Sequence, residues 1–103
     1  MAIIKSDHGE HQHIYGVLDK GGNSISGEGF NARILTDGLY VVEFNQPFRG
    51  TPAVTCTIFG PEWETLNLSV AIVDVTPWHF VCTTSSPNNR QGSGFTFIAF
   101  GDV

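Results

Sequence analysis

Apolar and polar residues alternate along most of this chain, and this period of two constrains its fold more than any other feature. Side chains two residues apart lie on the same face of a β-strand, so an alternating run buries one face and exposes the other. No segment of ten or more residues places apolar side chains at the spacing of an amphipathic helix. Twelve glycines and five prolines interrupt the alternating runs, as the turns between short strands require.

The clearest expected pair of strands is a hairpin formed by residues 29–35 and 39–44. Asp37-Gly38 lies between the two runs, and this dipeptide is a strong hairpin signal because glycine tolerates the positive φ of the turn. The side chains predicted to face the core from this hairpin are Phe30, Ala32, Ile34, Tyr40, Val42 and Phe44.

Further strands are expected at residues 53–59, 66–75, 78–83 and 95–100; residues 24–26 are a candidate short strand, and residues 14–18 are a short apolar run. The strand at residues 95–100 is apolar on both faces, which is typical of a strand at the centre of a sheet or at a subunit contact. Phe48 is expected to close one end of the core, and Trp78 to pack in the core or at its edge. Six or seven strands separated by frequent turns predict one all-β domain, a single antiparallel β-sandwich. We assign residues 14–103 to this domain and residues 1–13 to a polar, histidine-rich lead-in.

The chain is poor in charge, and most of its charges are acidic. Charged residues make up 15% of the 103 residues, against about 25% in typical soluble domains. Part of the surface is therefore either covered by another subunit or built from neutral polar residues. The net charge of −5 argues against a nucleic acid partner, which basic side chains would have to neutralise. No apolar run reaches the roughly 20 residues of a spanning helix, so we expect no membrane insertion.

The sequence lacks catalytic motifs, and we expect no enzyme activity. The acidic residues are scattered, and neither a Gly-x-Ser-x-Gly nucleophile turn nor a Gly-x-x-x-x-Gly-Lys phosphate loop occurs. Cys56 and Cys82 lie in separate apolar strands. They are either small buried hydrophobes or the two halves of a disulfide, whose geometry a sequence does not establish.

From Gly38 the chain reads G-L-Y-V-V-E-F-N-Q-P-F-R-G-T-P-A-V, and later N-L-S-V-A-I-V-D-V-T-P-W-H-F-V-C and F-T-F-I-A-F-G. This pattern resembles the small β-sandwich domain at the C-termini of phage tail fibres and bacterial collagen-like proteins. It is also similar, more distantly, to the H-type lectin domain. The resemblance covers residues 16–101 and implies a homotrimer on a virion or at a cell surface. The opening Met-Ala-Ile-Ile-Lys is too short and too quickly polar for a signal peptide, so we expect none in this chain. The sugar-binding residues of those lectins do not carry over, because Asn67-Leu68-Ser69 and Ser85-Ser86 occupy their places.

Two loops carry the side chains that we expect to bind a ligand. In the first, Trp63 between Glu62 and Glu64 could stack on a sugar face while the carboxylates bond hydroxyl groups. The alternative is a Trp63 that folds back on the sandwich edge or packs against a neighbouring subunit. The second loop offers polar groups suited to a carbohydrate, because loops on a rigid sandwich often carry binding; its candidates are Asn88, Asn89 and Arg90. The alternative there is a plain solvated loop.

A His-x-His pair formed by His11 and His13 is the candidate metal site. In an extended strand both imidazoles point to the same side, and imidazole suits Fe, Ni or Zn. Three subunits around an axis would offer six imidazoles to such a transition metal, which the resemblance to trimeric phage fibres makes coherent. The alternative is a solvated tail that binds metal only casually.

These observations predict a trimeric recognition module at the tip of a fibre or appendage. Its expected partners are two further copies of itself and a glycan or cell-surface receptor. The alternative is a purely structural module that trimerises and caps a longer fibre without a ligand of its own.

Overall fold

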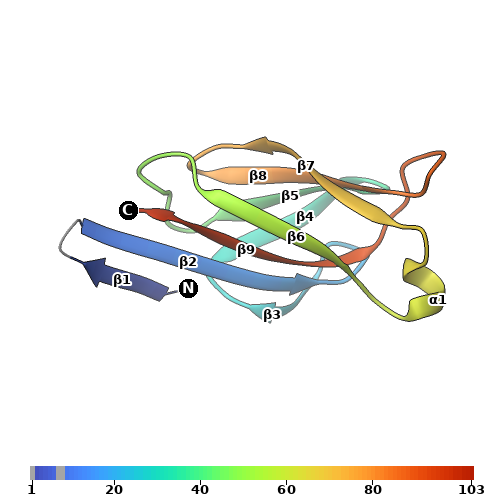
Figure 1. Ribbon diagram of the computed structural model, residues 1–103, viewed down its shortest axis with the longest axis horizontal. Helices are drawn as coiled ribbons and strands as arrows, with labels where there is room; N and C mark the ends of the chain where they lie inside the picture. Colours follow the sequence, from blue (N-terminus) through green and yellow to red (C-terminus); the bar gives the residue numbers. More distant parts are fainter. Residues whose placement is uncertain (1, 7–8) are drawn as a thin grey trace.

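Two antiparallel β-sheets pack face to face in the computed structural model of the protein, which describes residues 2–6 and 9–103 (Figure 1). The strands formed by these residues are β1 (Ala2–Ser6), β2 (Gly9–Leu18), β3 (Ser24–Gly27), β4 (Phe30–Thr36), β5 (Leu39–Phe44), β6 (Ala53–Phe59), β7 (Ser69–Val75), β8 (His79–Ser85) and β9 (Gly94–Asp102). The first sheet has the order β1-β2-β9-β6, with β3 also paired to β2, and the second sheet has the order β4-β5-β8-β7. The predicted all-β antiparallel sandwich is confirmed, with nine strands in the described residues where six or seven were expected.

The predicted hairpin is formed by β4 and β5. Phe30 lies opposite Phe44 and Ala32 opposite Val42, and Gly38 has the positive φ, +75°, that the turn requires. Phe30, Val42 and Phe44 are buried as expected. Ile34 is 38% exposed, contrary to the prediction. The register of the pair shifts just beyond Ile34, and this irregularity turns the end of β4 away from the core.

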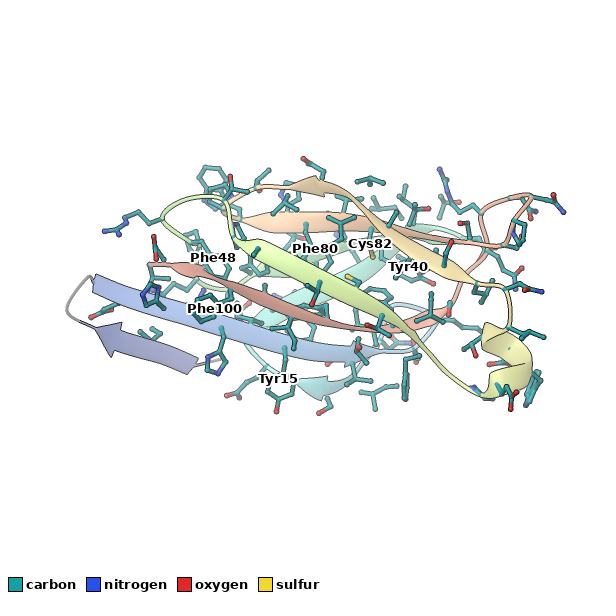
Figure 2. The ribbon with its side chains drawn as sticks, in the orientation of Figure 1. Tyr15, Tyr40, Phe48, Phe80, Cys82 and Phe100 are labelled. Atoms are coloured by element: carbon teal, nitrogen blue, oxygen red, sulfur yellow. The ribbon has the colours of Figure 1, made fainter. Side chains whose placement is uncertain are left out.

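The core between the sheets is largely aromatic. Phe97 of β9 contacts both Phe30 and Phe80 edge to face, with ring centroids 5.0 Å apart in each pair. Phe48 is buried and packs against Phe44, so the prediction that it closes one end of the core is confirmed (Figure 2). Trp78 is 62% exposed, so of its two predicted positions, in the core or at its edge, the core is excluded. It lies in the turn between β7 and β8, beyond the point where the two sheets pack.

Strand β9 lies at the centre of the first sheet, between β2 and β6. Its inward residues Phe95, Phe97 and Ala99 are buried, as the alternation predicted, whereas Ile98 and Phe100 on the other face are exposed. The central position of a strand that is apolar on both faces is thus confirmed.

The described residues of the predicted lead-in, 2–6 and 9–13, lie in strands β1 and β2. β1 and β2 pair antiparallel, and β2 runs without interruption through the predicted boundary after residue 13. The same stretch of β2 pairs with β9, where His11 lies opposite Asp102 and His13 opposite Phe100. Backbone hydrogen bonds from β9 hold this polar segment in the sheet, so a division at residue 13 has no counterpart in the fold.

The segment predicted as a loop at residues 60–65 contains one helical turn, α1 (Glu62–Thr65). The hydroxyl of Thr65 donates to the carbonyl of Pro61 at 3.1 Å, which closes this turn. Asn67 then adopts a left-handed conformation with φ of +66°, which Asn tolerates better than most residues. Strand β7 therefore begins at Ser69, three residues later than expected.

Candidate functional site

A hollow of about 480 Å³ is lined by residues of α1 and of the loop between β8 and β9. Figure 1 shows both segments at the same end of the sandwich. This volume falls within the roughly 300–1,000 Å³ of typical ligand pockets. We call it the polar hollow; its lining residues are Lys20, Phe59, Trp63, Glu64, Thr65, Leu66, Asn67, Leu68, Ser86, Pro87, Asn88, Gln91, Gly92, Ser93 and Gly94.

The helical turn α1 presents Trp63 on one wall of the polar hollow. Four residues make a single turn, and none of its side chains is buried. Trp63 is 78% exposed, although an indole of this size is usually covered in a folded chain. The expectation that Trp63 could fold back on the sandwich edge is therefore not met.

The opposite wall is the loop between β8 and β9, which is held at both its tip and its base. At the tip, the Ser86 hydroxyl donates to the Asn89 side-chain oxygen at 2.8 Å. At the base, the hydroxyl of Thr84 donates to the Gln91 carbonyl at 2.6 Å, and the Gln91 amide donates to the Thr84 carbonyl at 3.0 Å. These bonds give Asn88, at the tip, a defined place on the wall.

A buried tyrosine in the core bonds two of the segments that line the polar hollow, the turn after β2 and the end of the loop between β8 and β9. The hydroxyl of Tyr40 on β5 donates to the Lys20 carbonyl at 2.6 Å and accepts a bond from the Ser93 amide at 3.1 Å. Burial raises the pKa of Tyr40 above its ordinary value, so the hydroxyl stays protonated and remains a donor to Lys20.

Half of the predicted ligand-binding residues line the polar hollow. Trp63, Glu64 and Asn88 do so, although their two loops are far apart in the sequence. Glu62 is exposed outside the lining.

The two remaining predicted residues, Asn89 and Arg90, also lie outside the polar hollow. The Asn89 side chain accepts the bond from Ser86 within its own loop. Arg90 packs over the turn between β4 and β5, because its Cγ would lie 2.3 Å from a Cβ placed on Gly38. Both side chains therefore shape or flank the loop without facing the hollow.

Lys20 and Phe59 are site residues that the sequence analysis missed. Lys20 lies in the turn after β2, and its Nζ is 3.9 Å from Glu64 Oε1. Phe59 ends β6 on the outward side and is 47% exposed. The sequence feature that could have indicated Phe59 as a site residue is its position, as a large outward aromatic directly before Gly60-Pro61. Nothing in the local sequence around Lys20 indicates that its turn meets α1.

The two histidines of the candidate metal site lie on the outward face of β2. His11 stacks on Phe100, with ring centroids 5.6 Å apart, and its Nδ1 lies 2.9 Å from Asp102 Oδ1. This contact is close but poorly aligned for a hydrogen bond, because Nδ1 gains no partner of good geometry. Within residues 2–6 and 9–103 of one chain, no three His, Cys, Asp or Glu side chains gather around a metal position. A site shared by three subunits stays a prediction.

The two cysteines are free thiols that meet between the sheets. Cys56 comes from β6 of the first sheet and Cys82 from β8 of the second. The hydrogen bond with the Cys56 thiol, together with burial, raises the pKa of Cys82 well above its ordinary value. Both thiols therefore belong to the core and not to the polar hollow.

Comparison of the chain with models of known protein families, with curated proteins and with solved structures finds no match. Among the described residues, no helix has the length and apolar character needed to cross a membrane. The chemistry of the polar hollow is therefore the basis for inferring what the protein binds.

Proposed function

We propose that this protein is a recognition module that binds a glycan, free or on a cell-surface receptor, in the polar hollow. The observation that carries the proposal is that the exposed indole of Trp63 and the loop that bears Asn88 line one hollow. The hollow lies at one end of an elongated chain measuring 46 × 22 × 19 Å. A module at the tip of a fibre or appendage would use its site in this position.

The lining of the polar hollow matches the chemistry of a sugar ring. One face of a pyranose is a patch of C–H groups, and an indole buries such a patch at small conformational cost. The carboxylate of Glu64 accepts bonds from hydroxyl groups, while the Asn88 amide both donates and accepts them. A large exposed aromatic beside a few polar groups is also typical of binding hot spots.

A glycan array probed with the full chain tests this proposal. Trp63→Ala should abolish the binding of the glycans that the wild-type protein retains, because it removes the stacking surface. Trp78→Ala is the matched control, since Trp78 is equally an exposed indole but lies in the turn between β7 and β8. Binding that survives Trp63→Ala, or an array on which the wild-type protein binds nothing, would contradict the proposal.

A second candidate function is structural assembly, and the outward face of the first sheet favours it. Tyr15 lies opposite Ile98 in the pairing of β2 with β9, and Phe100 lies in the neighbouring row opposite His13. All three apolar side chains are exposed, and Tyr15 points away from the core in Figure 2. We call these residues the outer apolar face. The number of copies, three, is supported by the resemblance to fibre-tip domains.

The sedimentation of the full chain tests the assembly. A trimer that dissociates on Ile98→Lys would support association through the outer apolar face, because a buried lysine charge without a partner opposes burial. Val73→Lys is the matched control, since Val73 is also exposed but lies on β7 of the second sheet. A monomer at all concentrations would contradict the assembly. A trimer that binds no glycan would favour the structural module over the recognition module.

A further inference from the structure

A second hollow of about 480 Å³ adjoins the polar hollow at the same end of the sandwich. Its walls are mainly the side chains of Ile25, Phe59 and Pro61 and the backbone of Gly21 and Gly60. Ile25 on β3 is 59% exposed and Phe59 is 47% exposed, so this apolar surface faces solvent. We call it the apolar hollow.

The charged residues that border the apolar hollow have partners within the chain. The Asp19 carboxylate accepts hydrogen bonds from the Gly21 and Asn23 amides, both at 2.9 Å. These bonds stabilise the turn in which Asp19 itself lies. Lys20 and Glu64 face each other across 3.9 Å. The surface that remains for a ligand is therefore apolar, and the bonded turn forms part of it before any ligand arrives.

The two hollows adjoin each other, because Lys20, Phe59, Glu64 and Gly94 line both. The partly exposed ring of Phe59 is the largest side chain that the two hollows share. The Lys20–Glu64 pair marks the border, but the two side chains are 70% and 38% exposed and too far apart for a hydrogen bond. Such an exposed pair contributes little to stability, so a ligand could displace it at small cost.

We propose that the ligand is an amphipathic glycoside, whose sugar lies in the polar hollow and whose apolar aglycone lies in the apolar hollow. This inference rests on the proposed function and adds the chemical class of the ligand. A sugar alone would leave Ile25 and the outer part of Phe59 in water. An alkyl or aryl group joined to the sugar would cover both, and burying apolar surface is the main favourable contribution to such binding.

Titration calorimetry of the full chain with three kinds of probe tests the inference. The probes are methyl β-D-glucopyranoside and β-D-galactopyranoside, their n-octyl counterparts below the micelle concentration, and 1-octanol. We expect the octyl form of at least one sugar to bind at least about tenfold more tightly than its methyl form, because several methylene groups are buried. We expect 1-octanol to bind more weakly than that octyl glycoside.

Two variants test whether the aglycone lies in the apolar hollow. Ile25→Ser should remove the advantage of the octyl form and leave the affinity for the methyl form unchanged. Leu35→Ser is the matched control, because Leu35 is exposed to a similar extent, 48%, but lies on β4 of the second sheet. An octyl advantage that persists in Ile25→Ser would overturn the placement.

The outcomes separate the inference from the proposed function. Equal affinities for the methyl and octyl forms would overturn the inference and leave the glycan site standing. Equal affinities for octanol and the octyl glycosides would contradict the glycan site, and with it the inference. A chain that binds glycans on an array but none of the octyl glycosides would overturn the inference alone.

Discussion

The hydroxyl of Tyr40 donates a hydrogen bond of 2.6 Å to the carbonyl of Lys20, and thereby connects the core of the second sheet with a turn of the first. The same hydroxyl accepts a bond from the Ser93 amide. Since Lys20 and Ser93 both line the polar hollow, one buried oxygen fixes the distance between two of its walls. Tyr40 is therefore a positioning residue for the candidate site, although its own side chain lies in the core beneath the polar hollow.

Tyr40→Phe should destabilise the protein and weaken ligand binding together. The substitution leaves the Lys20 carbonyl and the Ser93 amide without their partner, which typically costs about 1–3 kcal/mol of unfolding free energy. Urea unfolding measures this loss, and titration of a bound glycan measures the affinity. Tyr15→Phe is the control, because Tyr15 is half exposed on the outer apolar face. An unchanged unfolding midpoint for Tyr40→Phe would contradict the positioning role.

Trp63→Ala should change binding without changing stability. An exposed side chain that buries little surface contributes within about 0.5 kcal/mol of zero to folding. Phe80→Ala gives the contrast, because Phe80 is fully buried, and loss of such a ring costs about 3–5 kcal/mol. Thermal or urea unfolding of both variants checks the comparison. A large destabilisation by Trp63→Ala would mean that the indole packs against the sandwich in solution.

The turn that forms part of the apolar hollow should weaken in acid. Hydrogen bonding from the Asn23 amide is the main cause that lowers the pKa of Asp19 below its ordinary value of 3.8. Because the pKa is lower in the folded chain, the carboxylate contributes its full stability above about pH 4 and loses it as the pH falls through the folded-state pKa.

Comparison of the wild-type protein with Asp19→Asn isolates this contribution. The wild-type protein should be the more stable of the two at about pH 7, and the difference should shrink below about pH 4. Urea midpoints at several pH values measure it. A difference that stays constant down to the acid limit would show that the Asp19 carboxylate is not what the turn depends on.

Cys82 should resist alkylation in the folded protein. The hydrogen bond with Cys56 and burial both favour its neutral thiol, whereas the reactive form is the thiolate. Iodoacetamide at about pH 8 should therefore modify Cys82 much more slowly in buffer than in urea. Mass spectrometry of the digested protein gives the two rates, and equal rates would contradict the packed thiol pair.

The alternating pattern predicted the core well, because burial of one strand face imposes the period of two that the sequence displays. Tyr40, Val42 and Phe44 on β5 and Phe95 and Phe97 on β9 are buried as expected. The pattern did not predict the short strand β1 or the first half of β2, whose side chains are polar in β2 alone. Backbone pairing with β9 holds the first half of β2 in the sheet. Such pairing does not depend on side-chain type, so the local sequence does not indicate it.

Prediction of the site was limited by topology in the same way. Trp63 and Asn88 were identified by residue type and loop position, but only the fold shows that their loops meet at one end of the sandwich. Lys20 and Phe59 were missed because distant strands bring them to that end. Arg90 has the right chemistry and faces the other side of its loop, which is set by contact with Gly38.

The place of β2 beside β9 also bears on how the chain acquires its fold. Their pairing joins His11 to Asp102, so nearly the whole chain separates the two partners. Contacts between such distant residues slow folding, since a long loop must close before any of them stabilises the chain. On the ribosome, β2 emerges long before β9 has been made, and until then it has an unpaired edge open to other chains. The first sheet therefore closes only after β9 has been made.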